Sequence, residues 1–375
     1  MSSTDSFWDK QREESRIKSE IAVKYFCSWA SIMKTRCKQL TYLDLFSGRG
    51  RYKDEKPSTP LLILNEVYKR YELQKQLRAY FYEDDKINHD ELKQSIEEHH
   101  AYSLMHFRPE VNHQSITREL IPELPIDDCT FCFIDPWGYK GVSLDLLESV
   151  THRWGCDSLF YISISGVQRN LRNPSQQQAL QDLFGTDGLK EIQAELSDSV
   201  SPKVSETIIM ERLRMALKSR KVEYFLEFGV EYSVRKKTSH FLVFISRHSL
   251  AFKIMKEIMA TYSLKDKDGV PLFRYGRYRI NQIEMPFHEY SIEKLKNRLQ
   301  SELSGSTLSV KEVYNICHKL GYRYIESNIK DALLLLEEQG DIVIDLPRHK
   351  RREKKTGDVS LGKSRIVTFR NNYVV

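Results

Sequence analysis

The chain has 375 residues, of which 40% are hydrophobic and 29% are charged, and this length and composition fit two folded domains with buried cores. The 58 Lys and Arg residues against 52 Asp and Glu give a formal net charge of +6, a mild excess that permits a polyanionic partner without requiring one. A polar, charged start and the lack of an apolar run of about 20 residues argue against a signal peptide and a membrane span, so we expect a cytoplasmic protein.

The first half of the chain alternates helical and strand-like segments. An amphipathic helix comes first, with apolar residues at helical spacing from Ile17 to Met33. The chain then alternates strand-like runs with helical ones, at 40–46, 60–71, 77–84, 89–100, 129–137, 143–154 and 158–165. Strands that are apolar on both faces and separated by helices predict an α/β fold, in which helices cover both sides of a parallel sheet.

The pattern changes in the middle of the chain. Residues 168–222 are mostly polar and helical, with no strand-like run, and predict a helical insertion. Two long β-like runs follow at 222–234 and 240–248, joined by the charged turn RKKTS, which is the pattern of an antiparallel hairpin. A helix is predicted after them, at 249–262.

The last part of the chain has a different organisation. From Ser291 onward there are three helical stretches, followed by two β-like runs that flank the basic loop RHKRREKK. This order predicts a winged helix, a variant of the helix-turn-helix. We therefore expect two domains, at 1–290 and 291–375.

The segment LDLFSGRG, which ends the first strand, is a candidate ligand-binding turn. In an open parallel sheet, ligands bind beyond the carboxyl ends of the strands. Gly48 and Gly50 can adopt positive φ and let a ligand approach the backbone, while Asp44 can accept hydrogen bonds from a cationic amine. The turn lacks the Lys-Ser/Thr of a P-loop and the third glycine of a dinucleotide motif. Glu83, at the end of the second strand, is a candidate for ribose hydroxyls, although the acidic run could also be a solvated strand end.

A third strand ends in FIDPWGYKG and brings Asp135, Pro136 and Trp137 to the same edge of the predicted sheet. A carboxylate beside a proline-fixed backbone can hold an exocyclic amino group, and an aromatic ring can stack on a base. Methylation of the amino group of adenine or cytosine needs both. The alternative is a strand-ending turn with a tryptophan in the core.

Together these segments resemble class I methyltransferases that use S-adenosylmethionine, and above all the three-Cys-motif partner protein family. The resemblance is carried by KYFCSWASIM, YLDLFSGRGRY, STPLLIL, FIDPWGYKG and the C-terminal winged helix. It implies a Rossmann-like domain, with a mostly parallel seven-stranded sheet that includes the antiparallel hairpin. It also implies S-adenosylmethionine bound near Asp44, Phe46, Gly48, Gly50 and Glu83.

The same resemblance implies a partner protein that looks like a radical-type iron–sulfur protein with a three-cysteine motif, and a role in mobile elements or antiviral defence. Amino methyltransferases of nucleic acids usually carry Asp/Asn-Pro-Pro-aromatic, whereas this chain has Asp-Pro-Trp-Gly. Three functions are compatible with the sequence. The first is methyl transfer to a base of RNA or DNA, and the second is a catalytically silent binding or assembly module. The third is methyl transfer to a small molecule or a protein, which the basic wing argues against.

If the chain is an enzyme, we expect Asp135 to orient the acceptor amine, Trp137 or Tyr139 to stack on it, and the insertion to cover it. Arg169 and Arg172, which follow the fifth strand, are candidates for the substrate-facing surface.

Basic residues of the predicted wing would bind phosphates; they are Arg348, Lys350, Arg351 and Arg352. The close pair Cys129 and Cys132 has no second pair or nearby histidines, which favours buried strand thiols over metal ligands, and we expect no metal site.

Overall fold

The computed structural model of the protein describes residues 11–127, 129–196, 202–231, 238–266, 268–276, 291–352 and 360–371. The chain divides into two compact units, Met1–Met259 and Ala260–Val375. The domain bounds expected from the sequence, 1–290 and 291–375, stay a prediction, because residues 277–290 lie outside the described part of the chain.

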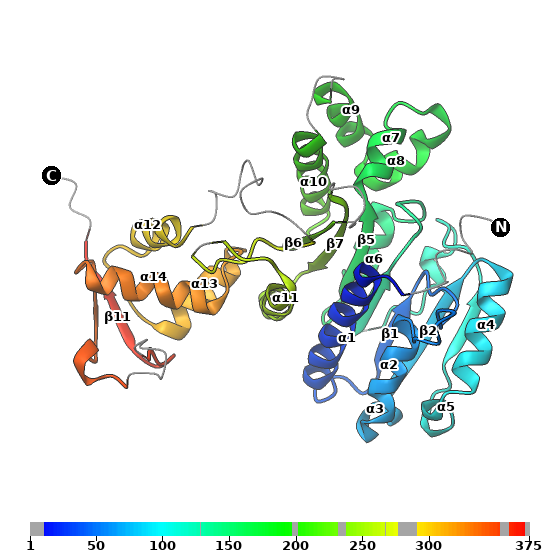
Figure 1. Cartoon of the computed structure of the whole chain (residues 1–375), viewed down its shortest axis with the longest axis horizontal. Coiled ribbons are helices and arrows are strands. Elements are labelled where there is room, and N and C mark those ends of the chain that lie inside the picture. The colour runs from blue at the N-terminus through cyan, green and yellow to red at the C-terminus, as the bar shows by residue number, and fades with distance from the viewer. Residues whose placement is uncertain are drawn as a thin grey trace. The chain divides into compact units, whose positions relative to one another are not determined.

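A mostly parallel sheet forms the centre of the first unit (Figure 1). Its strands are β1 (Leu40–Asp44), β2 (Leu77–Glu83), β3 (Glu110–His113), β4 (Thr130–Ile134), β5 (Asp157–Ser163), β6 (Tyr224–Glu231) and β7 (Thr238–Ser246). Their spatial order is β3-β2-β1-β4-β5-β7-β6. The first five strands run parallel, whereas β7 runs antiparallel to both β5 and β6. The α/β fold and the hairpin predicted from the sequence are therefore confirmed, while the short strand β3 was not predicted.

The helices of the first unit cover both faces of this sheet. They are α1 (Glu13–Met33), α2 (Thr59–Tyr68), α3 (Tyr71–Gln76), α4 (Lys86–Glu97), α5 (His100–Leu104), α6 (Leu144–Ser149), α7 (Ile164–Asn170), α8 (Gln177–Phe184), α9 (Thr186–Glu195), α10 (Pro202–Ser219) and α11 (Ser249–Tyr262), with short 3-10 turns at Ile121–Glu123 and Pro174–Gln176. In Figure 1, α1 and α2 lie in front of β1 and β2.

Aromatic side chains fix α1 against the sheet. Tyr25 packs on Phe131 of β4 with ring centroids 5.1 Å apart, and Phe26 packs on Tyr42 of β1 at 5.6 Å. Alternate residues of the same strands, such as Leu43, point to the opposite face. Because α1 is held by large buried rings, the polar residues on the same helix have fixed positions.

The helical segment between β5 and β6 belongs to the core. It spans α7 to α10, as the sequence predicted, and buries apolar side chains such as Leu183, Ile192 and Leu213 against the sheet. These helices pack on the face of the sheet that carries Leu43, opposite α1. The expectation that the insertion covers the acceptor site stays a prediction.

Cys37, just after α1, forms a disulfide with Cys129, just before β4, with the two Cα atoms 6.6 Å apart. The expectation of a free buried thiol was wrong for Cys129 and is confirmed for Cys132. The partners are 92 residues apart in the sequence, so local spacing gave no sign of the pairing.

The second unit contains helices packed on a small sheet. Its elements are β8 (Arg274–Tyr275), α12 (Ile292–Leu303), β9 (Thr307–Ser309), α13 (Val310–Lys319), α14 (Glu326–Glu338), β10 (Ile342–Ile344), a 3-10 turn (Arg348–Lys350) and β11 (Ile366–Phe369). The small sheet is antiparallel, in the order β10-β11-β9. The predicted helices and flanking strands are present, and their assignment as a winged helix stays a prediction.

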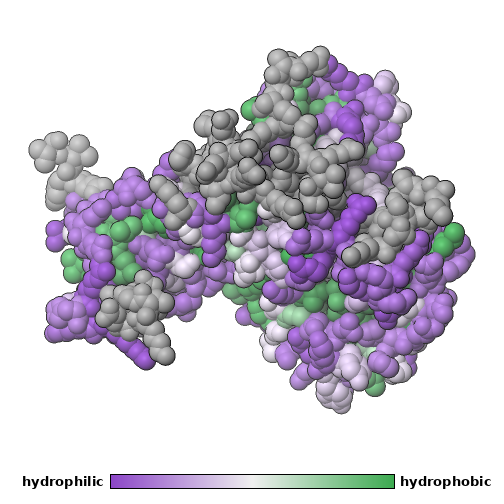
Figure 2. All heavy atoms as spheres, in the orientation of Figure 1, coloured by the Kyte–Doolittle hydropathy of each residue, from purple (hydrophilic) through white to green (hydrophobic). Residues whose placement is uncertain are grey.

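Within the described residues, none of the helices combines the length and the apolar character needed to cross a membrane. Figure 2 shows hydrophilic side chains over most of the visible surface of each unit, with hydrophobic ones in small groups.

Candidate functional site

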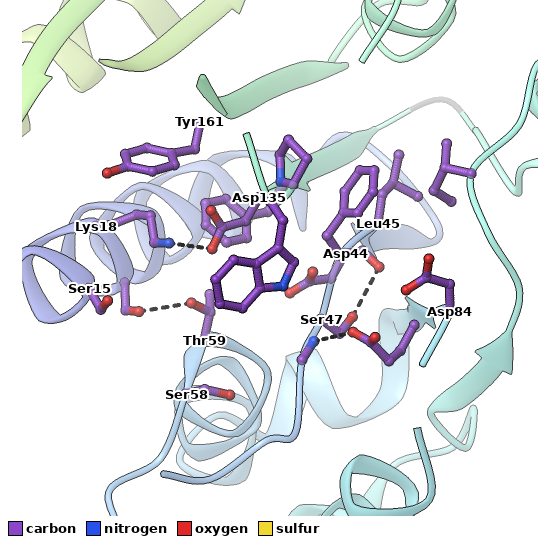
Figure 3. A pocket seen from close by; sticks show the side chains of 18 of the residues that line it. Ser15, Lys18, Asp44, Leu45, Ser47, Ser58, Thr59, Asp84, Asp135 and Tyr161 are labelled. Carbon is purple, nitrogen blue, oxygen red and sulfur yellow. Dashed lines mark hydrogen bonds and ion pairs between the residues drawn. The ribbon is translucent and has the colours of Figure 1, made fainter. Parts of the chain in front are cut away.

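A pocket opens at the carboxyl ends of β1, β2 and β4, with a volume of about 1030 Å³ including its mouth (Figure 3). The three carboxylates that the sequence placed at strand ends, Asp44, Glu83 and Asp135, all line it. The structure therefore brings together residues that lie far apart in the chain.

Asp44 ends β1 and is 1% exposed. Its Oδ2 accepts a hydrogen bond from the Tyr42 hydroxyl at 3.1 Å, while its Oδ1 has no hydrogen-bond partner among the described residues. Burial, followed by the charge of nearby Asp135, raises the pKa of Asp44 from 3.8 to about 7. The Asp44 carboxylate is thus poorly compensated in the free protein, and a cation in the pocket would stabilise it.

The glycine turn after β1 is held by Glu83. One carboxylate oxygen of Glu83 accepts the Gly48 N–H at 2.8 Å, and the other accepts the Asp85 N–H at 3.0 Å. Gly48 and Gly50 have φ values of 69° and 82°, where glycine is strongly favoured. Glu83 is 8% exposed, and burial raises the pKa of its carboxyl. Its position gives it a structural task in addition to the predicted contact with ribose.

Phe46 lies in the same turn and also lines the pocket. Its ring packs directly on Gly141: a Cβ atom added to Gly141 would lie 2.7 Å from the Phe46 Cζ atom. The turn after β1 and the turn after β4 therefore touch each other beside the pocket.

The segment after β4 forms the opposite part of the pocket. Asp135 makes an ion pair with Lys18 of α1, and Pro136 and Trp137 follow on the pocket lining. Trp137 is 59% exposed. A flat ring that is open to solvent beside a carboxylate matches the predicted arrangement for holding a planar amine.

Two further rings close this end of the pocket. The Lys18 ammonium lies 4.6 Å from the centre of the Tyr161 ring, and Tyr161 stacks on His240 with centroids 5.1 Å apart. Burial, with the charges of Lys18 and Arg169, lowers the pKa of His240 to about 3. The imidazole is therefore neutral at physiological pH.

Several predicted site residues do not line the pocket. Tyr139 is 3% exposed and packs in the core, so its ring is not available for stacking. Arg169 is exposed on α7. Arg172 is exposed beyond α7 and donates to the Leu196 carbonyl at 3.3 Å.

The four basic residues predicted in the wing have different environments. Arg351 is 8% exposed, pairs with Glu337 and donates to the Leu346 carbonyl at 2.7 Å. Arg348 pairs with Glu338, whereas Lys350 and Arg352 are exposed. Two of the four arginine and lysine side chains are thus engaged with acidic residues of α14.

The sequence analysis missed the pocket residues that come from α1, from the start of α2 and from the fifth and seventh strands. The most informative of them are Ser15, Lys18, Ser19, Ser58, Thr59, Tyr161 and His240. One signal was available: Ser15, Lys18 and Ser19 recur at helical spacing beside the apolar stripe of α1. A polar stripe of this kind on a buried helix indicates a lined cavity.

Comparison with protein-family models finds no match, and comparison with curated proteins finds none either. Among solved structures, the chain is similar to the DszA carbon methyltransferase, with 9% identity over 64% of this chain and 56% of that one and a TM-score of 0.39. It thus spans little more than half of that protein.

Two other similar structures were solved with adenosyl ligands. The N-terminal domain of human METTL16, solved with SAH, has 11% identity over 61% of this chain and 70% of that one, with a TM-score of 0.32. Trm1 from Pyrococcus horikoshii, solved with S-adenosyl-L-methionine, has 11% identity over 68% and 62%, with a TM-score of 0.33. At these TM-scores and identities, the activity of the chain does not follow from the proteins that it resembles.

Proposed function

We propose that this chain is an S-adenosylmethionine-dependent methyltransferase that acts on nucleic acid, at an exocyclic amino group of a base. The observation that carries the proposal is the pocket at the ends of β1, β2 and β4, in which the buried Asp44 Oδ1 has no hydrogen-bond partner among the described residues. The strand order, with β7 antiparallel, supports it as well, because this hairpin is typical of class I methyltransferases.

The pocket residues fit this cofactor. S-adenosylmethionine carries an ammonium and a sulfonium, and the unpaired Asp44 oxygen can accept a hydrogen bond from the ammonium. Gly48 lets the backbone approach the ligand, Phe46 offers an apolar surface, and Glu83 can bind hydroxyls of the ribose. Gly50, predicted for the same role, does not line the pocket and faces Leu92 and Ser95 instead. When bound, the cofactor would supply a methyl group that is already activated by the positive sulfur.

The segment after β4 would position the acceptor. Asp135 can accept a hydrogen bond from the acceptor amine and so direct its lone pair, while the exposed Trp137 ring can stack on the base. Pro136 fixes the backbone between the two side chains. Tyr139 takes no part in this arrangement, because it is buried in the core.

The second unit and the basic residues support a nucleic-acid substrate. The order helix, strand, helix, helix, strand, strand in the second unit fits a winged helix. Lys350 and Arg352 are exposed and would bind phosphates; Arg348 and Arg351 would contribute less, because they pair with Glu338 and Glu337. The three-cysteine-motif partner and the role in defence rest on the family resemblance alone.

Titration calorimetry and a methyl-transfer assay test the proposal. We expect S-adenosylmethionine to bind and radiolabel from its methyl group to enter pooled RNA or DNA. Replacing Asp135 with Ala should abolish transfer without weakening cofactor binding. Absence of cofactor binding would refute the proposal, and joint loss of binding and transfer in Asp135→Ala would refute the role of Asp135.

A second function is favoured by one observation. Asp135 is already paired with Lys18, and the Asp-Pro-Trp-Gly turn lacks the second proline of amino methyltransferases. The chain would then be a catalytically silent nucleic-acid-binding or assembly module. Cofactor binding without transfer to any nucleic acid or added partner would support this alternative.

A further inference from the structure

A second group of polar side chains lines the same pocket, on the wall formed by α1 and the start of α2 (Figure 3). The group consists of Ser15, Lys18, Ser19, Ser58 and Thr59. All but Lys18 are hydroxyl side chains that can donate a hydrogen bond. Ser15, Lys18 and Ser19 come from α1, whereas Ser58 ends the segment that follows β1 and Thr59 begins α2. Lys18 links this wall to the carboxylates through its ion pair with Asp135.

Ser58 occupies the N-cap position of α2 without capping the helix. A serine at this position usually accepts a hydrogen bond from a backbone N–H of the first turn. Here the side chain makes no capping bond, and its Oγ has no hydrogen-bond partner within the part of the chain that the structure describes. Ser58 is 6% exposed. A buried hydroxyl that lacks a partner in a ligand pocket indicates that the partner is a ligand atom.

The surroundings of Ser58 favour an oxyanion. The N-terminus of the ten-residue helix α2 carries partial positive charge. Its first turn can offer the N–H groups of Thr59 and Leu61, because Pro60 between them has none. The Lys18 ammonium lies on the same wall, and its side chain is only 10% exposed. Thr59 contributes a hydroxyl that lies 2.9 Å from the Ser19 hydroxyl.

The charge of the rest of the pocket selects the kind of anion. Among the described residues, Asp44, Glu83, Asp84 and Asp135 line the pocket, against Lys18 alone. A phosphate would be repelled by this excess of carboxylates. The carboxylate of an α-amino acid brings its own ammonium, for which the unpaired Asp44 Oδ1 provides an acceptor.

We propose that Ser58, Thr59 and Lys18 bind the carboxylate of the ligand's amino-acid end, and that this carboxylate competes with Asp135 for the Lys18 ammonium. The proposal rests on the proposed function, since the amino-acid end is that of S-adenosylmethionine. It goes further by giving Lys18 two alternative partners, one in each half of the pocket.

Because Lys18 can pair with either the ligand carboxylate or Asp135, binding of the cofactor affects binding of the acceptor. In the free protein the Lys18 ammonium neutralises Asp135. When the ligand carboxylate attracts Lys18, the Asp135 oxygens become available to accept a hydrogen bond from the acceptor amine. The cofactor therefore binds before the acceptor, and the empty pocket has low affinity for a base.

Calorimetry with two adenosyl compounds tests this subsite. S-adenosylhomocysteine carries the amino-acid end, whereas 5′-methylthioadenosine has the adenosyl thioether without it. In the wild type, the first should bind more tightly. Ser58→Ala should weaken S-adenosylhomocysteine about tenfold, the cost of one hydrogen bond to a charged group, and leave methylthioadenosine unchanged. Lys18→Met should weaken S-adenosylhomocysteine at least as much.

Asp135→Asn provides a result that a merely structural role would not give. It removes the competitor for Lys18, so S-adenosylhomocysteine should bind several-fold more tightly than in the wild type. The gain should vanish when Asp135→Asn is combined with Lys18→Met.

Ser143 is the matched control. It is also an N-cap serine, but it accepts the Leu146 N–H at 3.1 Å and lies outside the pocket lining. Ser143→Ala should lower stability without changing either affinity, the reverse of Ser58→Ala.

Equal affinity of the wild type for the two compounds, or unchanged S-adenosylhomocysteine binding in Ser58→Ala and Lys18→Met, would overturn the subsite. If Ser58→Ala weakened only the binding of inorganic phosphate, the ligand would be a phosphate and the assignment would be wrong. If the wild type bound neither adenosyl compound, the proposed function itself would fail, together with this proposal.

Discussion

Replacing Asp44 with Asn should stabilise the free protein at high pH and weaken its ligand binding. The folded protein raises the pKa of Asp44 from 3.8 to about 7. A raised carboxyl pKa means that folding favours the neutral acid. The stability it provides is therefore full below pH 3.8 and is lost as the pH rises through 7.

The magnitude follows from the size of the shift. About three pKa units at 1.36 kcal/mol each correspond to ~4 kcal/mol at pH 8. Asn avoids this loss, but its buried NH₂ group lacks a partner and costs about 1–3 kcal/mol. We expect a net gain of about 1–3 kcal/mol in the free energy of unfolding at pH 8, and a loss at pH 4.

Urea unfolding between pH 4 and 8 measures the first effect, and calorimetry with S-adenosylhomocysteine the second. Losing the charged acceptor for the ligand ammonium should weaken binding by about ten- to a hundredfold. Asp157→Asn is the matched control: Asp157 is buried, its pKa is raised, and it accepts the Tyr25 hydroxyl at 2.7 Å at the opposite end of the sheet. That control should change stability and leave binding unchanged. A stability difference between Asp44→Asn and wild type that does not grow with pH would refute the reasoning.

Three further outcomes are expected. Binding of S-adenosylhomocysteine by the wild type should weaken below pH 7, approaching tenfold per pH unit. The ligand ammonium binds the Asp44 carboxylate, and protonation of Asp44 removes this negative charge. Calorimetry at pH 5 to 8 measures the effect, and an affinity that does not change with pH would contradict it. Cys37→Ser should lower the free energy of unfolding by roughly 2–4 kcal/mol, because the Cys37–Cys129 bond no longer restricts the unfolded chain. Urea unfolding without reductant measures this difference. Equal stability of variant and wild type would count against the disulfide. Arg351→Met should lower the free energy of unfolding by about 3 kcal/mol, because it leaves Glu337 without its buried partner. Arg352→Ala should leave stability unchanged and reduce the slope of log affinity for nucleic acid against log salt concentration by about one. If Arg352→Ala destabilised the protein and Arg351→Met changed the salt slope instead, the predicted wing would bind nucleic acid differently.

The sequence predicted those features that depend on local pattern. Apolar strands separated by helices gave the parallel sheet and the hairpin, and strand-ending acids gave Asp44, Glu83 and Asp135, because parallel strands end at a common edge. Features set by tertiary contacts were missed. The position of Lys18 depends on how α1 packs, and the Cys37–Cys129 pair joins distant segments.

Tyr139 shows a limit of another kind. It follows Trp137 by two residues, and the sequence placed both at the rim with equal reason. The turn after β4 leaves Trp137 in solvent and sends Tyr139 into the core. Glycines at positions 138 and 141 have φ values of 101° and 83°, and such turns reverse the chain in ways that alternation along a strand does not describe.

The stacked pair of Tyr161 and His240 has a consequence for where the protein can work. An imidazole with a pKa of about 3 gains no proton in mildly acidic compartments or during acid stress. The His240 ring therefore stays neutral, whereas Asp44 in the same pocket titrates. A planar ligand would therefore meet the same neutral imidazole at every physiological pH. Only the interaction between a cationic group of the ligand and Asp44 would change with pH.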